Sequence, residues 1–188
     1  DLVTWTKQPG PVLRAQGPWY ETIDSGAWHD EAFRDPWVFA DPNGDGWHLL
    51  ITARANHGPA DDRGVVGHAT SPDLVSWTLQ PPLSEPGQGY GQLEVFETVR
   101  LEGRDYLVFN CLAGDLSAAH RATGTTGGVW LAAAERQRSH GDLVNLSAGQ
   151  PAAQAPAPIR AAAAEALDFD LVQIGIHRVS PYGSLSAC

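Results

Sequence analysis

The sequence contains no methionine and only two cysteines among its 188 residues. Cys111 stands in an apolar run and Cys188 is the last residue, which argues against a disulfide framework. No apolar run reaches the roughly 20 residues that a membrane-spanning helix needs, and no signal-peptide pattern stands at the start. Because the chain opens at Asp1 on a pattern typical of a strand inside a domain, we expect an N-terminally truncated piece of a longer protein.

Basic residues are also few. Twelve lysines and arginines face 22 aspartates and glutamates, which gives a formal net charge of −10. Such a surface repels a phosphate backbone unless basic residues form a concentrated stripe, and the sequence shows no such stripe. The composition therefore argues against nucleic acid as a partner, as the short apolar runs argue against a membrane. With 43% hydrophobic and 18% charged residues, the chain is otherwise typical of a globular protein.

What the sequence does have is an internal repeat. Asp-Leu-Val-Thr-Trp-Thr at residues 1–6 recurs as Asp-Leu-Val-Ser-Trp-Thr at residues 73–78, and a weaker copy begins at Asp142. A spacing of about 70 residues suits a four-stranded propeller blade with loop insertions. The repeat therefore predicts successive blades rather than one continuous sheet.

Strand and turn patterns alternate between the copies. In the first unit we expect strands at residues 37–39, 47–53, 64–70 and 74–79, and in the second at 93–101, 106–111 and 127–132, with turns at 41–46 and 102–105. We therefore predict an all-β fold, a partial β-propeller of about two to three blades over residues 1–147. The Ala/Pro-rich segment 148–188 breaks the pattern and is expected to be a divergent tail, disordered or helical near 161–167.

Two carboxylates recur in step with the strands. Asp35 lies twelve residues before Trp47, and Glu94 lies twelve residues before Tyr106, which begins the matching strand of the next unit. We therefore expect both carboxylates at the start of the innermost strands of adjacent blades, pointing into one axial pocket. Arg34 would keep Asp35 ionised, whereas apolar neighbours favour the protonated form of Glu94. One ionised and one protonated carboxyl is the pair that glycoside cleavage requires.

Ordinary structural roles fit the same two residues. An aspartate before a proline is commonly a turn or cap residue, and a lone glutamate in a strand commonly faces solvent. The matched spacing and the adjacent arginine favour a functional role, and they leave the structural alternative open.

Aromatic and polar residues lie in the connection that leads to Asp35. Aromatic rings bind the C–H faces of sugars, and polar groups bind their hydroxyls. Trp28 also fits a wedge between blades, and Arg54 also fits an ion pair with a surface acid. Residues 29–31 match no metal motif, so we expect no metal and no cofactor. The candidate substrate-binding residues are Arg34, Trp19, Tyr20, Trp28, His29, Arg54 and Gln92.

At residues 32–39 the sequence Ala-Phe-Arg-Asp-Pro-Trp-Val-Phe resembles the Arg-Asp-Pro motif of glycoside hydrolase family 32 and its levansucrase relatives. Residues 67–77 resemble a repeated unit typical of the same group. The resemblance covers roughly residues 1–135 and implies a five-bladed propeller that acts on fructosyl linkages of sucrose or fructans. It also implies that Asp35 is the transition-state stabiliser, that Glu94 is the general acid/base, and that the partner is an oligosaccharide or sucrose-like substrate.

Two departures from the family pattern bear on activity. The family usually has Glu-Cys-Pro at the acid/base, whereas residues 94–96 are Glu-Val-Phe. The family's nucleophile lies in a Trp-x-Asn-Asp-Pro-Asn-type motif, and the similar residues 41–44 fall in a hairpin after the Arg-Asp-Pro strand. Because a retaining mechanism needs that nucleophile, we expect the chain to be inactive alone. An arabinanase/xylosidase-like hydrolase, a glycoside phosphorylase and a noncatalytic carbohydrate-binding propeller are the alternatives.

Overall fold

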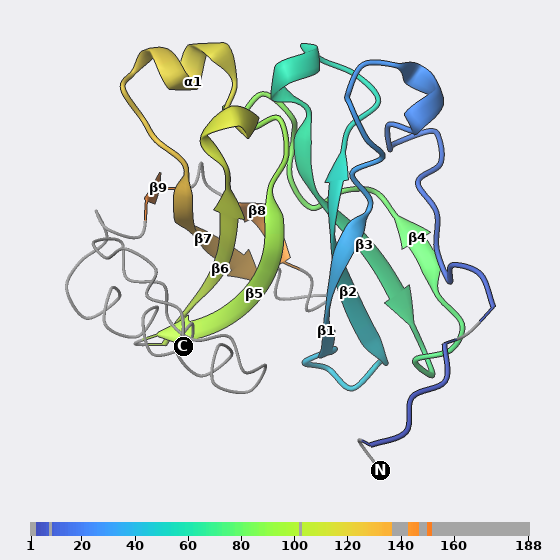
Figure 1. Ribbon diagram of the computed structural model, residues 1–188. Coiled ribbons are helices and arrows are strands. Elements are labelled where there is room, and N and C mark those ends of the chain that lie inside the picture. Colours follow the sequence, from blue (N-terminus) through green and yellow to red (C-terminus); the bar gives the residue numbers. More distant parts are fainter. Residues whose placement is uncertain (1–2, 8, 102, 137–142, 147–149, 152–188) are drawn as a thin grey trace, which may run out of the picture.

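A computed structural model shows two antiparallel β-sheets that follow one another along the chain (Figure 1). It describes residues 3–7, 9–101, 103–136, 143–146 and 150–151. The first sheet has the order β1 (Arg34–Ala40), β2 (Trp47–Arg54), β3 (Gly64–Ser71) and β4 (Thr78–Gln80). The second has the order β5 (Glu94–Leu101), β6 (Arg104–Cys111), β7 (Gly128–Arg136) and β8 (Leu143–Leu146), and β9 (Gln150–Pro151) pairs with β7. The described helical segments are short: η1 (Ile23–Ser25), η2 (Ala60–Asp62), η3 (Ala113–Asp115) and α1 (Ala118–Ala122).

Each sheet is a meander in which strands adjacent in sequence pair with one another, as the repeat predicted. The described part is therefore all-β, and its two sheets are consecutive blades of a partial propeller. Strand β8 coincides with the weak third copy of the repeat, although Asp142 itself lies outside the described residues. The predicted helix at 161–167 and most of the predicted tail also lie outside them.

Two of the predicted strands are wrong in part. Residues 3–7 form no strand, in contrast to the pattern at the start of the chain. The strand expected at 74–79 begins only at Thr78. The cause is the carboxylate of Asp73, which accepts the backbone N–H groups of Val75 at 2.9 Å and Ser76 at 2.7 Å. These bonds tie the segment into a local turn that competes with the sheet.

A β-bulge interrupts the first strand of each sheet at the same point. In the first sheet Arg34 pairs with Thr52, but Trp37 pairs with Leu50, so β1 holds one extra residue. In the second, residues 94 and 97 pair with residues 110 and 108 in the same way. The residue after each first pair has a left-handed backbone, with φ 54° at Asp35 and φ 53° at Val95. The two sheets thus repeat the irregularity as well as the strand order.

The main hydrophobic core lies between the two sheets. Figure 1 shows the sheets side by side, and β5 lies next to both β1 and β2. A hydrogen bond of 3.1 Å from Nε1 of Trp37 to Oγ1 of Thr98 joins β1 to β5 across the core. The sheets therefore hold the starts of β1 and β5 close together. The larger buried members of this core are Leu50, Val66, Tyr90, Leu93, Phe96, Leu107, Phe109, Leu116 and Trp130.

The opposite face of the first sheet carries an apolar groove of about 370 Å³, lined by residues from the segment before β1, from β1 and β2, and from the turn before β4. Val38 in this groove is 41% exposed. When the two sheets are aligned on their bulges, the groove face of the first sheet matches the face of the second sheet that is buried in the core. The corresponding pairs of residues on the two sheets are Pro36 and Phe96, Val38 and Thr98, Leu49 and Leu107, and Ile51 and Phe109.

Within the described residues, no helix is long and apolar enough to cross a membrane.

Candidate active site

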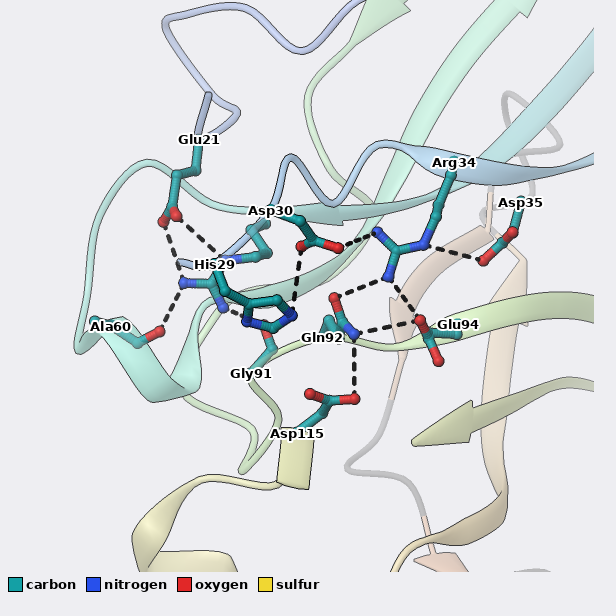
Figure 2. A network of polar contacts seen from close by, with 11 residues as sticks. Glu21, His29, Asp30, Arg34, Asp35, Ala60, Gly91, Gln92, Glu94 and Asp115 are labelled. Atoms are coloured by element: carbon teal, nitrogen blue, oxygen red, sulfur yellow. Dashed lines mark hydrogen bonds and ion pairs between the residues drawn. The ribbon is translucent and has the colours of Figure 1, made fainter. Parts of the chain in front are cut away.

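Arg34 is the centre of a polar network at the start of β1 (Figure 2). Its guanidinium lies 2.7 Å from Oε1 of Glu94, 3.3 Å from Oδ2 of Asp30 and 3.8 Å from Oδ2 of Asp35. It also donates to Oε1 of Gln92 at 3.2 Å. One cation therefore binds three carboxylates that come from a loop, from β1 and from β5. Both predicted catalytic carboxylates lie within reach of this single side chain.

Opposing effects act on the charge of Arg34. Burial lowers its pKa, but the hydrogen bond to Glu94 and the charges of Asp30, Glu94 and Asp35 raise it, and the net shift is upward. Arg34 is therefore a permanent positive charge, and it compensates the negative charge that the three acids bring together.

The bulges explain how the two sheets bring these residues together. Arg34 and Glu94 each occupy the pair just before the bulge, so they are the equivalent residues of the two sheets. The expected equivalence of Asp35 and Glu94 is wrong by one residue, since Asp35 corresponds to Val95. The carboxylates nevertheless converge, because Arg34 spans the seam from β1 to β5.

Asp35 is held by its backbone, by the ion pair with Arg34 and by a hydrogen bond from Thr52. Its left-handed φ of 54° is more accessible to aspartate than to most residues. Oγ1 of Thr52 on β2 donates to its Oδ2 at 3.3 Å. The side chain is 34% exposed, so the carboxylate is both fixed and accessible to a ligand.

Glu94 is the more enclosed carboxylate, with 18% of its side chain exposed. Its Oε1 accepts from Arg34 at 2.7 Å and from Nε2 of Gln92 at 3.2 Å. Gln92 is only 3% exposed and donates in addition to Oδ2 of Asp115 at 3.1 Å. Asp115, at the end of η3, was not predicted from the sequence. No motif surrounds it, and only its position just after β6 relates it to the site.

Arg54 and Tyr20 are buried in the scaffold, in contrast to their predicted role in substrate binding. Arg54 is 2% exposed, and it donates to Glu21 at 3.3 and 3.2 Å, to the carbonyl of Ala60 at 2.6 Å and to the carbonyl of Gly91. Tyr20 is 1% exposed, donates to the carbonyl of Gln80 at 2.7 Å and accepts from a backbone N–H on β3. Both side chains connect the loop before β1 to the first sheet, and neither faces a substrate.

Trp28, in the loop before β1, lies between Arg54 of β2 and Gly91 in the segment that leads into β5. Its ring covers the guanidinium of Arg54 at 3.9 Å, a cation–π contact. A Cβ atom at Gly91 would lie 2.6 Å from the same ring, so only glycine fits there. This packing is what the wedge, the alternative to a sugar platform, would require. Trp19 is also half-buried and packs on the small core around Ala53.

His29 is the most exposed of the candidates, with 66% of its side chain accessible. Its Nε2 lies 3.8 Å from Oδ1 of Asp30, beside the Arg34 network (Figure 2). In the part of the chain that the structure describes, no group of three histidine, cysteine or acidic side chains is placed to hold a metal ion. Among the predicted site residues, His29, Arg34 and Asp35 have the more exposed polar side chains, and Glu94 is partly accessible at 18%.

Comparison with solved structures agrees with this architecture. The catalytic domain of the β-fructofuranosidase of Microbacterium saccharophilum K-1 superposes on 64% of the chain with a TM-score of 0.52 and 20% sequence identity. The inulosucrase of Halalkalicoccus jeotgali bound to kestose superposes on 77% with a TM-score of 0.56 and 25% identity. The chain has a β-fructofuranosidase-like fold. It spans 30% and 40% of the length of these two proteins.

Sequence comparisons add one short match. No protein-family profile matches the chain. A stretch of 42 residues is 85% identical to part of the valine–pyruvate aminotransferase of Mycobacterium tuberculosis. The matched stretch covers 22% of this chain and 11% of that protein. A match of this length is too short to describe the two sheets, so the β-fructofuranosidase-like fold rests on the structural comparison.

Proposed function

We propose that the chain carries part of the active site of a fructosidase-like glycoside hydrolase that acts on fructosyl linkages of sucrose or fructans. Asp35 would stabilise the transition state by binding sugar hydroxyls, and Glu94 would be the general acid/base. The observation that supports this most directly is the Arg34 guanidinium, which binds Glu94 at 2.7 Å and Asp35 at 3.8 Å across the seam between the sheets.

The chemistry follows from the two environments. Asp35 lies 3.8 Å from Arg34, accepts from Oγ1 of Thr52 at 3.3 Å and is 34% exposed, so its carboxylate is placed to accept further hydrogen bonds from hydroxyl groups. Glu94 is more enclosed, as suits a group that exchanges a proton with a leaving oxygen.

A retaining reaction needs a carboxylate nucleophile besides the acid/base, and residues 41–44, which resemble the family's nucleophile motif, lie in the turn between β1 and β2. We therefore expect the chain to bind fructosides without turning them over. Asp30, the third acid on Arg34, is the residue to replace next if the chain does release fructose.

The test is titration of the chain with kestose and sucrose by calorimetry, together with an assay for released fructose. Asp35→Asn should weaken binding by about tenfold, the equivalent of one charge-assisted hydrogen bond. Asp24→Asn, the same change at an exposed acid in η1, should leave binding unchanged. Equal affinity for the two variants, or preferential binding of arabinan or xylan fragments, would contradict the proposal.

A further inference from the structure

Gln92 and Asp115 form a buried hydrogen-bond chain behind Glu94 (Figure 2). They are 3% and 8% exposed, so neither is placed to contact a substrate. Nε2 of Gln92 lies 3.2 Å from Oε1 of Glu94 and 3.1 Å from Oδ2 of Asp115. Oε1 of Gln92 accepts from Arg34 at 3.2 Å. The amide is therefore surrounded by two acceptors and one donor.

These partners allow the amide only one orientation. A flipped Gln92 would turn its carbonyl oxygen towards two carboxylates and its NH₂ group towards a guanidinium, which cannot accept a hydrogen bond. Asp115 contributes to this choice from the side remote from β1. Without its carboxylate, one of the two acceptors that hold the NH₂ group would be lost.

The orientation of Gln92 decides which oxygen of Glu94 accepts hydrogen bonds and which oxygen carries the proton. Both donors, Arg34 at 2.7 Å and Gln92 at 3.2 Å, bind the same atom, Oε1. A proton placed on Oε1 would meet two N–H groups. The proton of the acid form is therefore favoured on the other oxygen, Oε2, for which the described residues provide no such donor.

We propose that Asp115 is a positioning residue that acts through Gln92 to reserve Oε1 of Glu94 for the two donors and to keep the transferable proton on Oε2. The inference rests on the proposed function and deepens it. During cleavage, the Oε2–H bond would break as the proton passes to the glycosidic oxygen, which leaves with the electron pair of the broken C–O bond while the anomeric carbon forms a bond to the carboxylate nucleophile that the family resemblance implies. Deprotonated Oε2 would later take a proton from the water whose oxygen attacks that carbon and releases the nucleophile.

The side-chain amide of Gln92 provides a test that needs no activity. In ¹⁵N-labelled protein, its two Nε2 protons should be shifted and protected by bonds to two carboxylates. As the pH is lowered until Glu94 is protonated, the proton that faces Glu94 should stay protected, because Oε1 still accepts. Glu94→Gln should preserve the signal as well, since its NH₂ group can occupy the place of the protonated Oε2.

Replacement of Asp115 separates positioning from simple support. Asp115→Asn retains an acceptor, so the Gln92 signals should persist and the affinity for kestose should change by less than about twofold. Asp115→Ala should expose one Gln92 proton to exchange and weaken kestose binding about tenfold. Asp24→Asn is the control, and a matching denaturation midpoint shows that a variant is folded.

Three outcomes would overturn the inference. They are unchanged Gln92 signals in Asp115→Ala, a loss of kestose affinity in Asp115→Asn equal to that in Asp115→Ala, and loss of protection of the Gln92 proton when Glu94 is protonated. Failure of the proposed function is recognised separately. In that case the wild-type chain binds no kestose, whereas the Gln92 signals still report whether Asp115 holds the amide.

Discussion

Arg34 is the residue on which most of the polar contacts of the site depend. Its removal would leave Asp30, Asp35 and Glu94 facing one another without a compensating charge. We expect Arg34→Gln to lower the free energy of unfolding by about 2 kcal/mol, because partly buried groups lose their partner. Urea denaturation measures this. Arg100→Gln, which breaks an exposed ion pair of 3.5 Å with Asp105, should cost less than about 1 kcal/mol, and equal losses would contradict the central role of Arg34.

A second polar cluster lies inside the first sheet, away from the site. Asp41 lies 2.7 Å from Nε2 of His48, whose Nδ1 lies 2.9 Å from Nε2 of His68. Burial, followed by the proximity of His48, lowers the pKa of His68 to about 4. His68 is 6% exposed, so above about pH 4 the folded protein holds its ring in the neutral form.

The stability of the fold should therefore depend on pH below neutrality. The unfolded chain takes up a proton on His68 near pH 6.5, whereas the folded chain does so only near pH 4. The free energy of unfolding should fall as the pH drops through this window, by up to about 3 kcal/mol. Denaturation of His68→Gln should show a weaker dependence between these two pH values, and His57→Gln, at an exposed ring, serves as the control. A wild-type slope in His68→Gln would refute the assignment.

At the scale of elements, the bulges of β1 and β5 store backbone strain. Val95 is β-branched and has a left-handed φ of 53°, a conformation that favours glycine. Its side chain is 57% exposed, so it contributes little packing. We expect Val95→Gly to raise the free energy of unfolding by about 1 kcal/mol. Val75→Gly, at a 76% exposed valine without a positive φ, should lower it by up to about 1 kcal/mol, and chemical denaturation of both variants decides between these signs.

The strands could be predicted from the sequence, but their register could not. Alternation and turn residues are local, so they located β2, β3, β6 and β7 well. The twelve-residue spacings that suggested the equivalence of Asp35 and Glu94 each include the hairpin between two strands. The two hairpins differ in length, because Ala40 pairs with Trp47 whereas Leu101 pairs with Arg104. The bulge depends on the partner strand, and no local pattern encodes it.

The members of the Arg34 network could be predicted only where a motif marked them. Arg-Asp-Pro marked Arg34 and Asp35, whereas the repeat led to Glu94 through an equivalence that is wrong by one residue. The burial of Arg54 and Tyr20 depends on partners far away in sequence, such as Glu21 and Gln80, so composition could not reveal it. Asp115 acts through Gln92, a contact that exists only once β5 and η3 are in place.

At the scale of the molecule, the apolar groove of the first sheet leaves Val38 and Leu74 41% and 46% exposed, although the corresponding face of the second sheet is a core. Exposed apolar patches of this kind promote association. We expect the isolated chain to self-associate at rising concentration, and Val38→Glu to reduce this in sedimentation velocity experiments. Leu112→Glu, at a 62% exposed leucine outside the groove lining, adds the same charge and should have a smaller effect. Equal effects would show that charge alone governs association.

The seam between the sheets divides the candidate site into two parts, one on each sheet. Arg34 and Asp35 belong to the first sheet and Glu94 to the second. A backbone cut in the exposed stretch at Glu85, between β4 and β5, would leave each half with an incomplete set of charges. Reunion of two such polypeptides would restore the constellation in one step, so ligand capture could serve as a split reporter of their docking.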